Sequence, residues 1–403
     1  MEMLDRFIRY CKVNTRSDAS SLTVPSSHCQ YRFAADVLVN DLKEIGVKDV
    51  VLSESGIVYG KIDATDDSIK SKVGFIAHMD TADYNSEEVK PQLIQDYDGQ
   101  TIRLNDHMVL SPDQFPSLKD HVGQTIICTD GTTLLGGDDK AGIVIIMEMA
   151  KRLILDPTIP HGPIRIAFTP DEEIGHGTDH FDLKLFDADY GFTIDGGDIH
   201  SVTTETFNAT KADIEIQGFS IHPGSAYEKM VNAIDIATKL ACMLPDHAKP
   251  QYTQDHQGFY HLESLSGNCD HASMHYIIRD HDHGKLKDKK AYLKSVVKTM
   301  NIRYGKAITL TMEDQYRNML VVLKDHPEVL KTVEDAFHDL GWSYHYASAR
   351  GGTDGANLSF MGLPCPNLGT GGYNAHGPYE YVVYEEMQAM VELLITMVSK
   401  ETL

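Results

Sequence analysis

Residues 72–78 are K-V-G-F-I-A-H and residues 163–173 are P-I-R-I-A-F-T-P-D-E-E, two short apolar runs that both end in polar residues suited to binding. Between them, A-G-I-V-I-I-M-E-M-A-K-R-L at residues 141–153 predicts a long helix. Strands that alternate with helices in this way indicate a mainly parallel sheet with helices on both faces. The sequence therefore predicts an α/β fold, with its active site at the carboxyl ends of the strands.

The rest of the chain predicts two domains. Helical spacing of apolar residues predicts helices at Met3–Val13 and Ser27–Ile45. From about Ala209 the pattern changes, and a small β-α-β-α-β unit fits the stretch that follows. Candidate ligands occur before residue 196 and again at residue 376, but they are sparse between. We therefore expect a larger domain made of residues 1–207 and 317–403, with a smaller α+β domain inserted at residues 208–316.

The composition excludes several classes of partner. The chain has 403 residues, with 36 Lys and Arg against 59 Asp and Glu, and a formal net charge of −23. Nucleic acids and anionic membranes bind through clusters of Lys and Arg, so neither is an expected partner. The first residues are acidic where a secretory signal would be basic, and no segment stays apolar long enough to span a bilayer, so we expect a cytoplasmic protein. The six cysteines include no C-x-x-C pair, which disfavours a zinc ribbon and a disulfide framework.

Residues suited to a metal site follow the first predicted strand. In F-I-A-H-M-D-T, His78 ends the strand, and Asp80 is spaced to reach back and orient the imidazole, as carboxylates often do for metal-bound histidines. In L-L-G-G-D-D-K-A-G, an aspartate can cap the helix that follows, but a cap explains one Asp and not two. Asp138 is therefore a candidate bridge between two metal ions, because a carboxylate has two oxygens.

Further candidates follow later strands. Glu172 and Glu173 lie in T-P-D-E-E-I-G, Asp195 in F-T-I-D-G-G, and His376 in the glycine-rich G-G-Y-N-A-H-G. Each of them alone fits a turn as well as a ligand. Together the candidates give two histidines and several carboxylates without a cysteine, a set typical of catalytic Zn, Mn or Co. The single-zinc protease pattern H-E-x-x-H does not occur.

These residues lie in motifs that resemble the peptidase T family, the tripeptide aminopeptidases of the di-zinc superfamily that also contains aminoacylases and carboxypeptidases. The motifs run in order from near residue 70 to residue 380, and as a set they are highly specific. They are F-I-A-H-M-D-T, L-L-G-G-D-D-K-A-G, A-F-T-P-D-E-E-I-G, T-I-D-G-G, H-P-G-S-A, H-Y-I-I-R-D, R-G-G-T-D-G-A, F-M-G-L-P-C-P-N-L and G-G-Y-N-A-H-G.

The resemblance implies two zinc ions per chain, with Mn²⁺ or Co²⁺ as alternatives. By position in the motifs, His78, Asp138 and Asp195 would bind one ion. Asp138, Glu173 and His376 would bind the other, so that Asp138 is the bridge. The expected fold is that of a zinc exopeptidase with an inserted lid domain.

The resemblance also implies a reaction. The enzyme would remove the N-terminal residue from short peptides, above all tripeptides, by attack of a metal-bridging water with Glu172 as general base. Asp80 would orient His78. The inserted domain would be a lid that carries His222, which in relatives reaches the substrate carbonyl when the lid closes. Whether two chains pair through their lids stays open.

Three residues are candidates for binding the substrate. A guanidinium is the natural bidentate partner of a peptide's terminal carboxylate, and the matched motifs contain Arg279 and Arg350. Arg350 is preferred, because it lies next to the glycine loops of the larger domain; a structural salt bridge is the alternative for both. Asn374 is the third candidate. At Gly369 and Ala375 the chain departs from the aromatic residues expected of the family, which would reshape the pocket.

Other interpretations remain open. The same metals with a different pocket would make a dipeptidase or an N-acyl amino acid amidohydrolase. A catalytically silent binding module would require a missing ligand or base, and none is missing. An acidic α/β protein without metal would require every acidic residue at a strand end to be a coincidental surface turn.

Overall fold

The computed structural model describes residues 1–399, which form two compact units. The first unit comprises residues 1–204, 321–347 and 353–399, and the second comprises Glu205–Leu320 and Ser348–Gly352. The second unit is slightly wider than the predicted insertion at residues 208–316.

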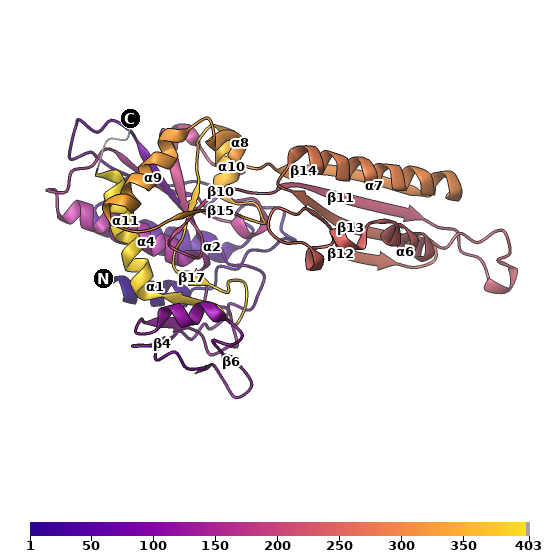
Figure 1. Cartoon of the computed structure of the whole chain (residues 1–403), viewed down its shortest axis with the longest axis horizontal. Coiled ribbons are helices and arrows are strands. Elements are labelled where there is room, and N and C mark those ends of the chain that lie inside the picture. The colour runs from indigo at the N-terminus through magenta and orange to yellow at the C-terminus, as the bar shows by residue number, and fades with distance from the viewer. Residues whose placement is uncertain (400–403) are drawn as a thin grey trace. The chain divides into compact units, whose positions relative to one another are not determined.

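The first unit, to which the helices labelled α1, α4, α9 and α11 in Figure 1 belong, is built on an eight-stranded sheet with a parallel centre. Its strand order is β1-β2-β8-β3-β9-β16-β10-β15. Strand β3 pairs in parallel with β8 and β9, and β9 pairs in parallel with β16. Towards the edges, β1, β2 and β10 join their neighbours antiparallel. The strands are β1 (Lys48–Leu52), β2 (Val58–Ile62), β3 (Val73–His78), β8 (Ile164–Thr169), β9 (Tyr190–Ile194), β10 (Ser201–Glu205), β15 (His345–Ser348) and β16 (Asn367–Leu368).

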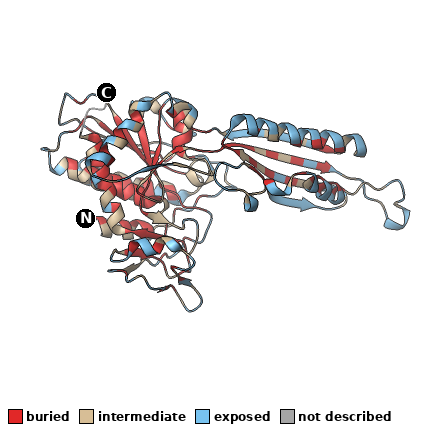
Figure 2. Cartoon of the chain, viewed as in Figure 1, coloured by how far each residue is buried: buried red, intermediate tan, exposed pale blue. Residues whose placement is uncertain are grey.

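The central strands β3, β8 and β9 are buried on both faces, as the continuous apolar runs predict for parallel strands. In β3, Phe75 and Ala77 point into the main core, while Ile76 points into a smaller core on the opposite face. In β8, Phe168 points into the main core and Ala167 into the smaller one. Figure 2 shows these strands and the long helix α4 as buried. The predicted α/β fold with helices on both faces is confirmed, and the antiparallel edges add to it.

Helices cover the sheet on both sides. The main core lies under α4, α1, α3, α9 and α11, whereas α5 and α10 belong to the smaller core. The expected helix at residues 27–45 is a continuous helical stretch whose middle, Ala34–Leu38, is π-helical. The helices of this unit are α1 (Met3–Cys11), α2 (His28–Phe33), α3 (Val39–Ile45), α4 (Gly137–Leu155), α5 (Leu183–Phe186), α9 (Pro327–Asp339), α10 (Asp354–Met361) and α11 (Tyr384–Val398).

A second, four-stranded sheet of the first unit has the order β17-β18-β7-β4. Its strands come from distant parts of the chain, so this sheet joins residues 92–128 to residues 372–383. They are β4 (Gln92–Ile94), β7 (Ile126–Cys128), β17 (Gly372–Tyr373) and β18 (Tyr381–Val383). The short β5 (Ile102–Arg103) and β6 (Val109–Leu110) form a hairpin, and a 3₁₀ helix spans Pro116–His121.

The second unit is an antiparallel sheet in the order β12-β13-β11-β14, covered on one face by α6 and α7. Alternation explains the single covered face: Ile214 and Ile216 of β11 are buried under the helices, while Glu215 between them is exposed. The elements are β11 (Asn208–Gln217), α6 (Ala233–Met243), β12 (Phe259–Gly267), β13 (His271–Asp280), α7 (His283–Tyr304) and β14 (Ile308–Tyr316). The short helix α8 (Leu320–Leu323) begins at the boundary, and all but its first residue belongs to the first unit.

Two details differ from the sequence predictions. The predicted β-α-β-α-β unit lacks strand β12, because from Leu262 onwards most of its residues are exposed and give no apolar signal. The segment Ser348–Gly352, assigned to the larger domain, belongs to the second unit. The guanidinium of Arg350 fixes it there by donating to the carbonyls of Thr253, Asp255 and Gln257. Within residues 1–399, none of the helices combines the length and apolar character that crossing a bilayer requires.

Candidate metal centre

The parallel sheet brings the predicted ligands to one edge. His78 is the last residue of β3, Asp195 follows β9, and Glu172 and Glu173 form a 3₁₀ turn shortly after β8. Because these strands are parallel neighbours, their carboxyl ends meet at the same edge of the sheet. Asp138 joins them from the start of α4.

The carboxylate of Asp138 lies between the two histidines. Its Oδ1 is 3.0 Å from Nε2 of His78, and its Oδ2 is 3.1 Å from Nε2 of His376. His376 also approaches Oε1 of Glu173 at 3.0 Å, and His78 approaches Oδ1 of Asp195 at 3.7 Å. One oxygen of the Asp138 carboxylate thus faces His78, which is close to Asp195, and the other faces His376, which is close to Glu173.

Asp80 supports this arrangement from behind. Its Oδ1 lies 3.3 Å from Nδ1 of His78, on the ring edge opposite Asp138. The same carboxylate accepts hydrogen bonds from the backbone N–H groups of Glu172 (3.0 Å) and Glu173 (3.2 Å). Asp80 is fully buried. It therefore positions both the histidine and the acidic turn, which is more than the orienting role that its spacing predicted.

The adjacent acids at the start of α4 divide their roles. The carboxylate of Asp139 accepts from the backbone N–H groups of Gly142 (3.1 Å) and His78 (3.1 Å), so Asp139 caps the helix and ties it to the end of β3. Asp138 is free of capping and projects towards the histidines.

Two further acidic residues of the centre were not predicted from the sequence. Glu380 is buried and accepts from the backbone N–H groups of Leu135 (2.7 Å), Gly136 (2.8 Å) and Asp138 (2.9 Å), which shapes the loop that presents Asp138. Asp354 is buried beside Thr169, whose hydroxyl donates to it at 2.7 Å. Asp354 lies inside the matched motif R-G-G-T-D-G-A, and that was its only sequence signal.

Burial and crowding perturb the acids. Burial raises the pKa of Glu172 well above its usual value, and the charge of Asp195 raises it further. Burial also raises the pKa of Glu173 and of Asp195. For Asp138 burial acts in the same direction, but the hydrogen bonds and charges of His376 and His78 outweigh it and lower the pKa.

The histidines respond in the opposite sense. The carboxylates of Asp138 and Glu173 raise the pKa of His376 to about 11. Burial lowers the pKa of His78, but Asp195, Asp138 and Asp80 outweigh it and raise the pKa well above its usual value. Within the described part of the chain, none of Asp138, Glu172, Glu173 and Asp195 forms a salt bridge with Lys or Arg. The centre therefore gathers four carboxyl groups and two histidines, and among the described residues no Lys or Arg forms a salt bridge with those carboxyl groups.

This donor set fits divalent metal ions. Single ligand atoms of His78, Asp138 and Glu173 lie within 4.8 Å of one another, and so do those of His78, Glu172 and Asp195. Imidazole with carboxylate oxygen suits Zn²⁺, Mn²⁺ or Co²⁺. The group suited to bridge two neighbouring ions is the carboxylate of Asp138, because its two oxygens face His78 and His376.

The remaining candidates have other surroundings. Asn374 follows β17 and donates to the carbonyl of Tyr379 at 3.2 Å, so it holds the loop that carries His376. His222 belongs to the second unit, where it is exposed and its Nδ1 accepts from the N–H of Gly224 at 3.1 Å.

The two arginines also belong to the second unit. Arg350 is engaged by backbone carbonyls and by the hydroxyl of Thr253 at 3.0 Å, and it covers the ring of Phe207. The preference for Arg350 assumed that this residue lies in the larger domain, whereas it belongs to the second unit. Binding of the peptide's carboxylate by Arg350 stays a prediction. Arg279 donates one hydrogen bond, to the carbonyl of Arg350 at 3.1 Å, and its Nε has no partner among residues 1–399.

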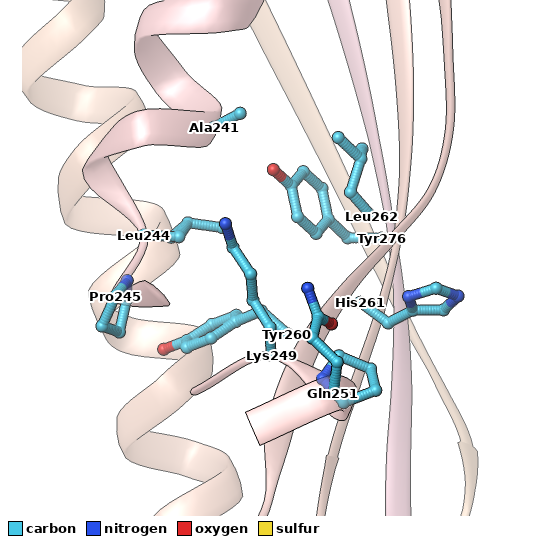
Figure 3. A pocket seen from close by; sticks show the side chains of 10 residues that line it. Ala241, Leu244, Pro245, Lys249, Gln251, Tyr260, His261, Leu262 and Tyr276 are labelled. Atoms are coloured by element: carbon cyan, nitrogen blue, oxygen red, sulfur yellow. The ribbon is translucent and has the colours of Figure 1, made fainter. Parts of the chain in front are cut away.

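A cavity of about 290 Å³ in the second unit has no comparable chemistry. Figure 3 shows Tyr276 and Leu262 on one side of it, Leu244 and Pro245 on the other, and the side chain of Lys249 between them. Its lining offers apolar and phenolic surface with a single histidine, His261, and no carboxylate. The acidic edge of the large sheet is the stronger candidate site.

Comparisons with known proteins identify the family of the chain. The chain belongs to the peptidase family M20/M25/M40, whose family model matches residues 136–400. The chain is therefore a peptidase, a hydrolase of this class.

Its curated relatives narrow the class. The chain is 46% identical over 401 residues to Peptidase T of Caldanaerobacter subterraneus and 45% identical over 397 residues to Peptidase T of Fusobacterium nucleatum. The matches cover 98% of this chain and 98% and 96% of the relatives. Peptidase T is thus the protein that this chain resembles along its whole length, as its motifs predicted.

Solved structures show the same fold. The aminopeptidase PepT of Bacillus cereus superimposes with a TM-score of 0.76 at 23% identity, covering 98% of this chain and 97% of that one. A tripeptidase of Staphylococcus aureus superimposes with a TM-score of 0.78 at 22% identity and the same coverage.

Proposed function

We propose that this chain is a two-zinc aminopeptidase that removes the N-terminal residue from short peptides, with tripeptides as its main substrates. One observation carries the proposal: Oδ1 and Oδ2 of Asp138 face His78 and His376 at 3.0 and 3.1 Å. A carboxylate placed in this way is suited to bridge two metal ions.

His78 and Asp195 would hold one ion and Glu173 and His376 the other, with Asp138 shared. When bound, such ions polarise the scissile carbonyl and lower the pKa of water towards 7. A dinuclear metal-binding peptidase of Bacillus subtilis from the M20 family shares the fold, with a TM-score of 0.65 at 13% identity, which is consistent with this arrangement.

Glu172 is the proposed general base. Its ligand-type oxygen lies within 4.8 Å of His78 and Asp195, so a water between these groups is within its reach. Burial raises the pKa of its carboxyl, which makes it a stronger base than an exposed glutamate. Glu172 would take the proton of the attacking water and then pass it to the leaving amine.

The second unit would supply substrate contacts. The ring of His222 is exposed, and its proposed role is to donate from Nε2 to the carbonyl oxygen as charge develops there. Arg279 is the first proposed partner of the peptide's terminal carboxylate and Arg350 the alternative, because Arg279 makes fewer hydrogen bonds within the described residues than Arg350 does. Pairing of two chains through the lid and a cytoplasmic location stay predictions.

A dipeptidase or N-acyl amino acid amidohydrolase remains the second candidate. The fold is shared with the aminoacylhistidine dipeptidase of Vibrio alginolyticus, at a TM-score of 0.63 and 12% identity, so the fold by itself does not choose the substrate.

A substrate panel tests the proposal. Metal-stripped protein would be reloaded with zinc and assayed on di-, tri- and tetrapeptides of matched sequence, each with a free and an acetylated N-terminus. We expect hydrolysis to require metal, to be highest for free tripeptides, and to be lost on acetylation. Preferential cleavage of the acetylated substrates would instead establish the amidohydrolase, and full activity without metal would exclude the two-zinc mechanism.

A further inference from the structure

Glu205, His256 and His281 form a separate cluster of metal-ligand side chains within the second unit. Glu205 ends β10, His256 precedes β12, and His281 lies between β13 and α7. One ligand atom of each lies within 4.8 Å of the other two. Three segments that are distant in sequence therefore place two imidazoles and one carboxylate together.

His281 is the buried member of this cluster. It is 7% exposed, and within residues 1–399 neither of its ring nitrogens has a hydrogen-bond partner of normal geometry. Its ring packs against Phe207 at 4.2 Å and His256 at 4.6 Å between centroids, and the backbone of Ala349 is a polar neighbour. The backbone of Ala349 can serve one ring nitrogen at most, and a buried polar atom without a partner is unfavourable, so the other nitrogen requires an explanation.

The distances match a metal site. Zn–N and Zn–O bonds of about 2.0–2.1 Å in a tetrahedron place neighbouring donors roughly 3.3 Å apart. Nε2 of His256 lies 3.4 Å from Oε2 of Glu205. The side chain of His256 is 59% exposed, so a small rotation can bring its ring closer to His281.

The cluster is also supported from outside, as metal ligands usually are. Nδ2 of Asn318 donates to Oε2 of Glu205 at 3.4 Å and to the carbonyl of His281 at 3.2 Å. Asn208 donates to the same carbonyl at 2.8 Å. These bonds fix the carboxylate and the backbone of the buried histidine.

We infer that Glu205, His256 and His281 bind a zinc-type transition metal ion, with water at the remaining coordination position. Two imidazoles favour Zn²⁺, Co²⁺ or Ni²⁺ over Mg²⁺ and Ca²⁺, which prefer oxygen ligands. The ion would fasten the loop of His256, whose neighbours Asp255 and Gln257 hold Arg350 through their carbonyls. The site is independent of the proposed peptidase centre, since it shares no residue with it.

Metal counting on the full chain tests the inference. Metal-stripped wild type, His256→Ala and the control His271→Ala would be dialysed against a series of free Zn²⁺ concentrations and analysed for bound zinc. His271 is a suitable control, because it is similarly exposed and pairs with Glu215 of the same sheet at 2.7 Å. We expect His256→Ala to bind one equivalent fewer than wild type and His271→Ala to bind the same number.

A second variant and a cobalt spectrum test the same site independently. His281→Phe keeps the ring shape that packs on Phe207 and should also lose one equivalent. With Co²⁺, the difference spectrum between wild type and His256→Ala should show d–d bands of one ion. Equal zinc stoichiometry and affinity in wild type and His256→Ala would overturn the inference. A defect in the peptidase centre would alter the total bound but not this difference.

Discussion

Replacing Asp80 with asparagine tests how the centre is positioned. The carboxylate makes three contacts: Nδ1 of His78 at 3.3 Å and the N–H groups of Glu172 at 3.0 Å and Glu173 at 3.2 Å. An asparagine can place its oxygen at Oδ1 and keep the first two contacts. Its NH₂ group then faces the N–H of Glu173, so one hydrogen bond to a charged acceptor is lost and two donors oppose each other.

The expected loss of zinc affinity and activity follows from the one hydrogen bond that asparagine cannot make. A hydrogen bond to a charged group contributes about 1.5–3 kcal/mol, which corresponds to roughly a 10–100-fold loss when it acts on a metal ligand. Asp80→Asn should therefore weaken zinc binding and lower kcat/KM by about 10–100-fold each. Asp80→Ala leaves two buried N–H groups unpaired at about 1–3 kcal/mol each, so the free energy of unfolding should fall by about 2–6 kcal/mol.

Zinc affinity would be measured by competition with a chromophoric chelator, turnover with a free tripeptide, and stability by urea unfolding of the metal-free protein. Glu385→Gln is the matched control, because Glu385 accepts two hydrogen bonds from Thr125, at 2.7 and 2.8 Å, outside the metal centre. It should lose stability but keep zinc affinity and turnover. Wild-type zinc affinity and turnover in Asp80→Asn would refute the reasoning.

Four further predictions concern the centre and the lid. Glu172→Gln should retain both zinc ions, because Glu172 is not a proposed ligand, and lose about 10²–10⁴-fold in kcat, because the general base is removed. Loss of zinc would instead identify Glu172 as a ligand. Asp138→Ala should lose zinc together with activity, because both ions would lose the carboxylate that they share. Full zinc content by elemental analysis would contradict the role of Asp138 as a bridge. His222→Ala should keep its zinc and lose about 10²–10³-fold in kcat with little change in KM, whereas wild-type kcat would identify an ordinary surface histidine. Zinc binding should release protons, because the pKa of about 11 keeps His376 protonated at pH 7 and a ligand must be neutral; affinity should then rise with pH, and calorimetry in two buffers of different ionisation enthalpy should detect the release.

Much of the first unit was predictable from local pattern. Apolar runs such as residues 73–77 and 164–168 determine buried strands, and the apolar stretch after Asp138 determines α4. Because parallel strands end at one edge, their polar successors were expected to converge, and the structure brings them together. These features depend on neighbours in sequence, which is why the sequence by itself determined them.

Long-range contacts were decided only by the tertiary structure. Nothing near Arg350 in the sequence indicates that its donors are used by a loop almost a hundred residues earlier, and nothing near Glu380 indicates three N–H partners in the loop before α4. The exposed strand β12 gave no apolar alternation, so its pairing with β13 became visible only in the folded sheet. Glu205, His256 and His281 are likewise unremarkable in sequence. The physical reason is common to all of them: hydrogen bonds and metal ligands depend on distance in space, and the path of the chain between two residues leaves no local signal of where they meet.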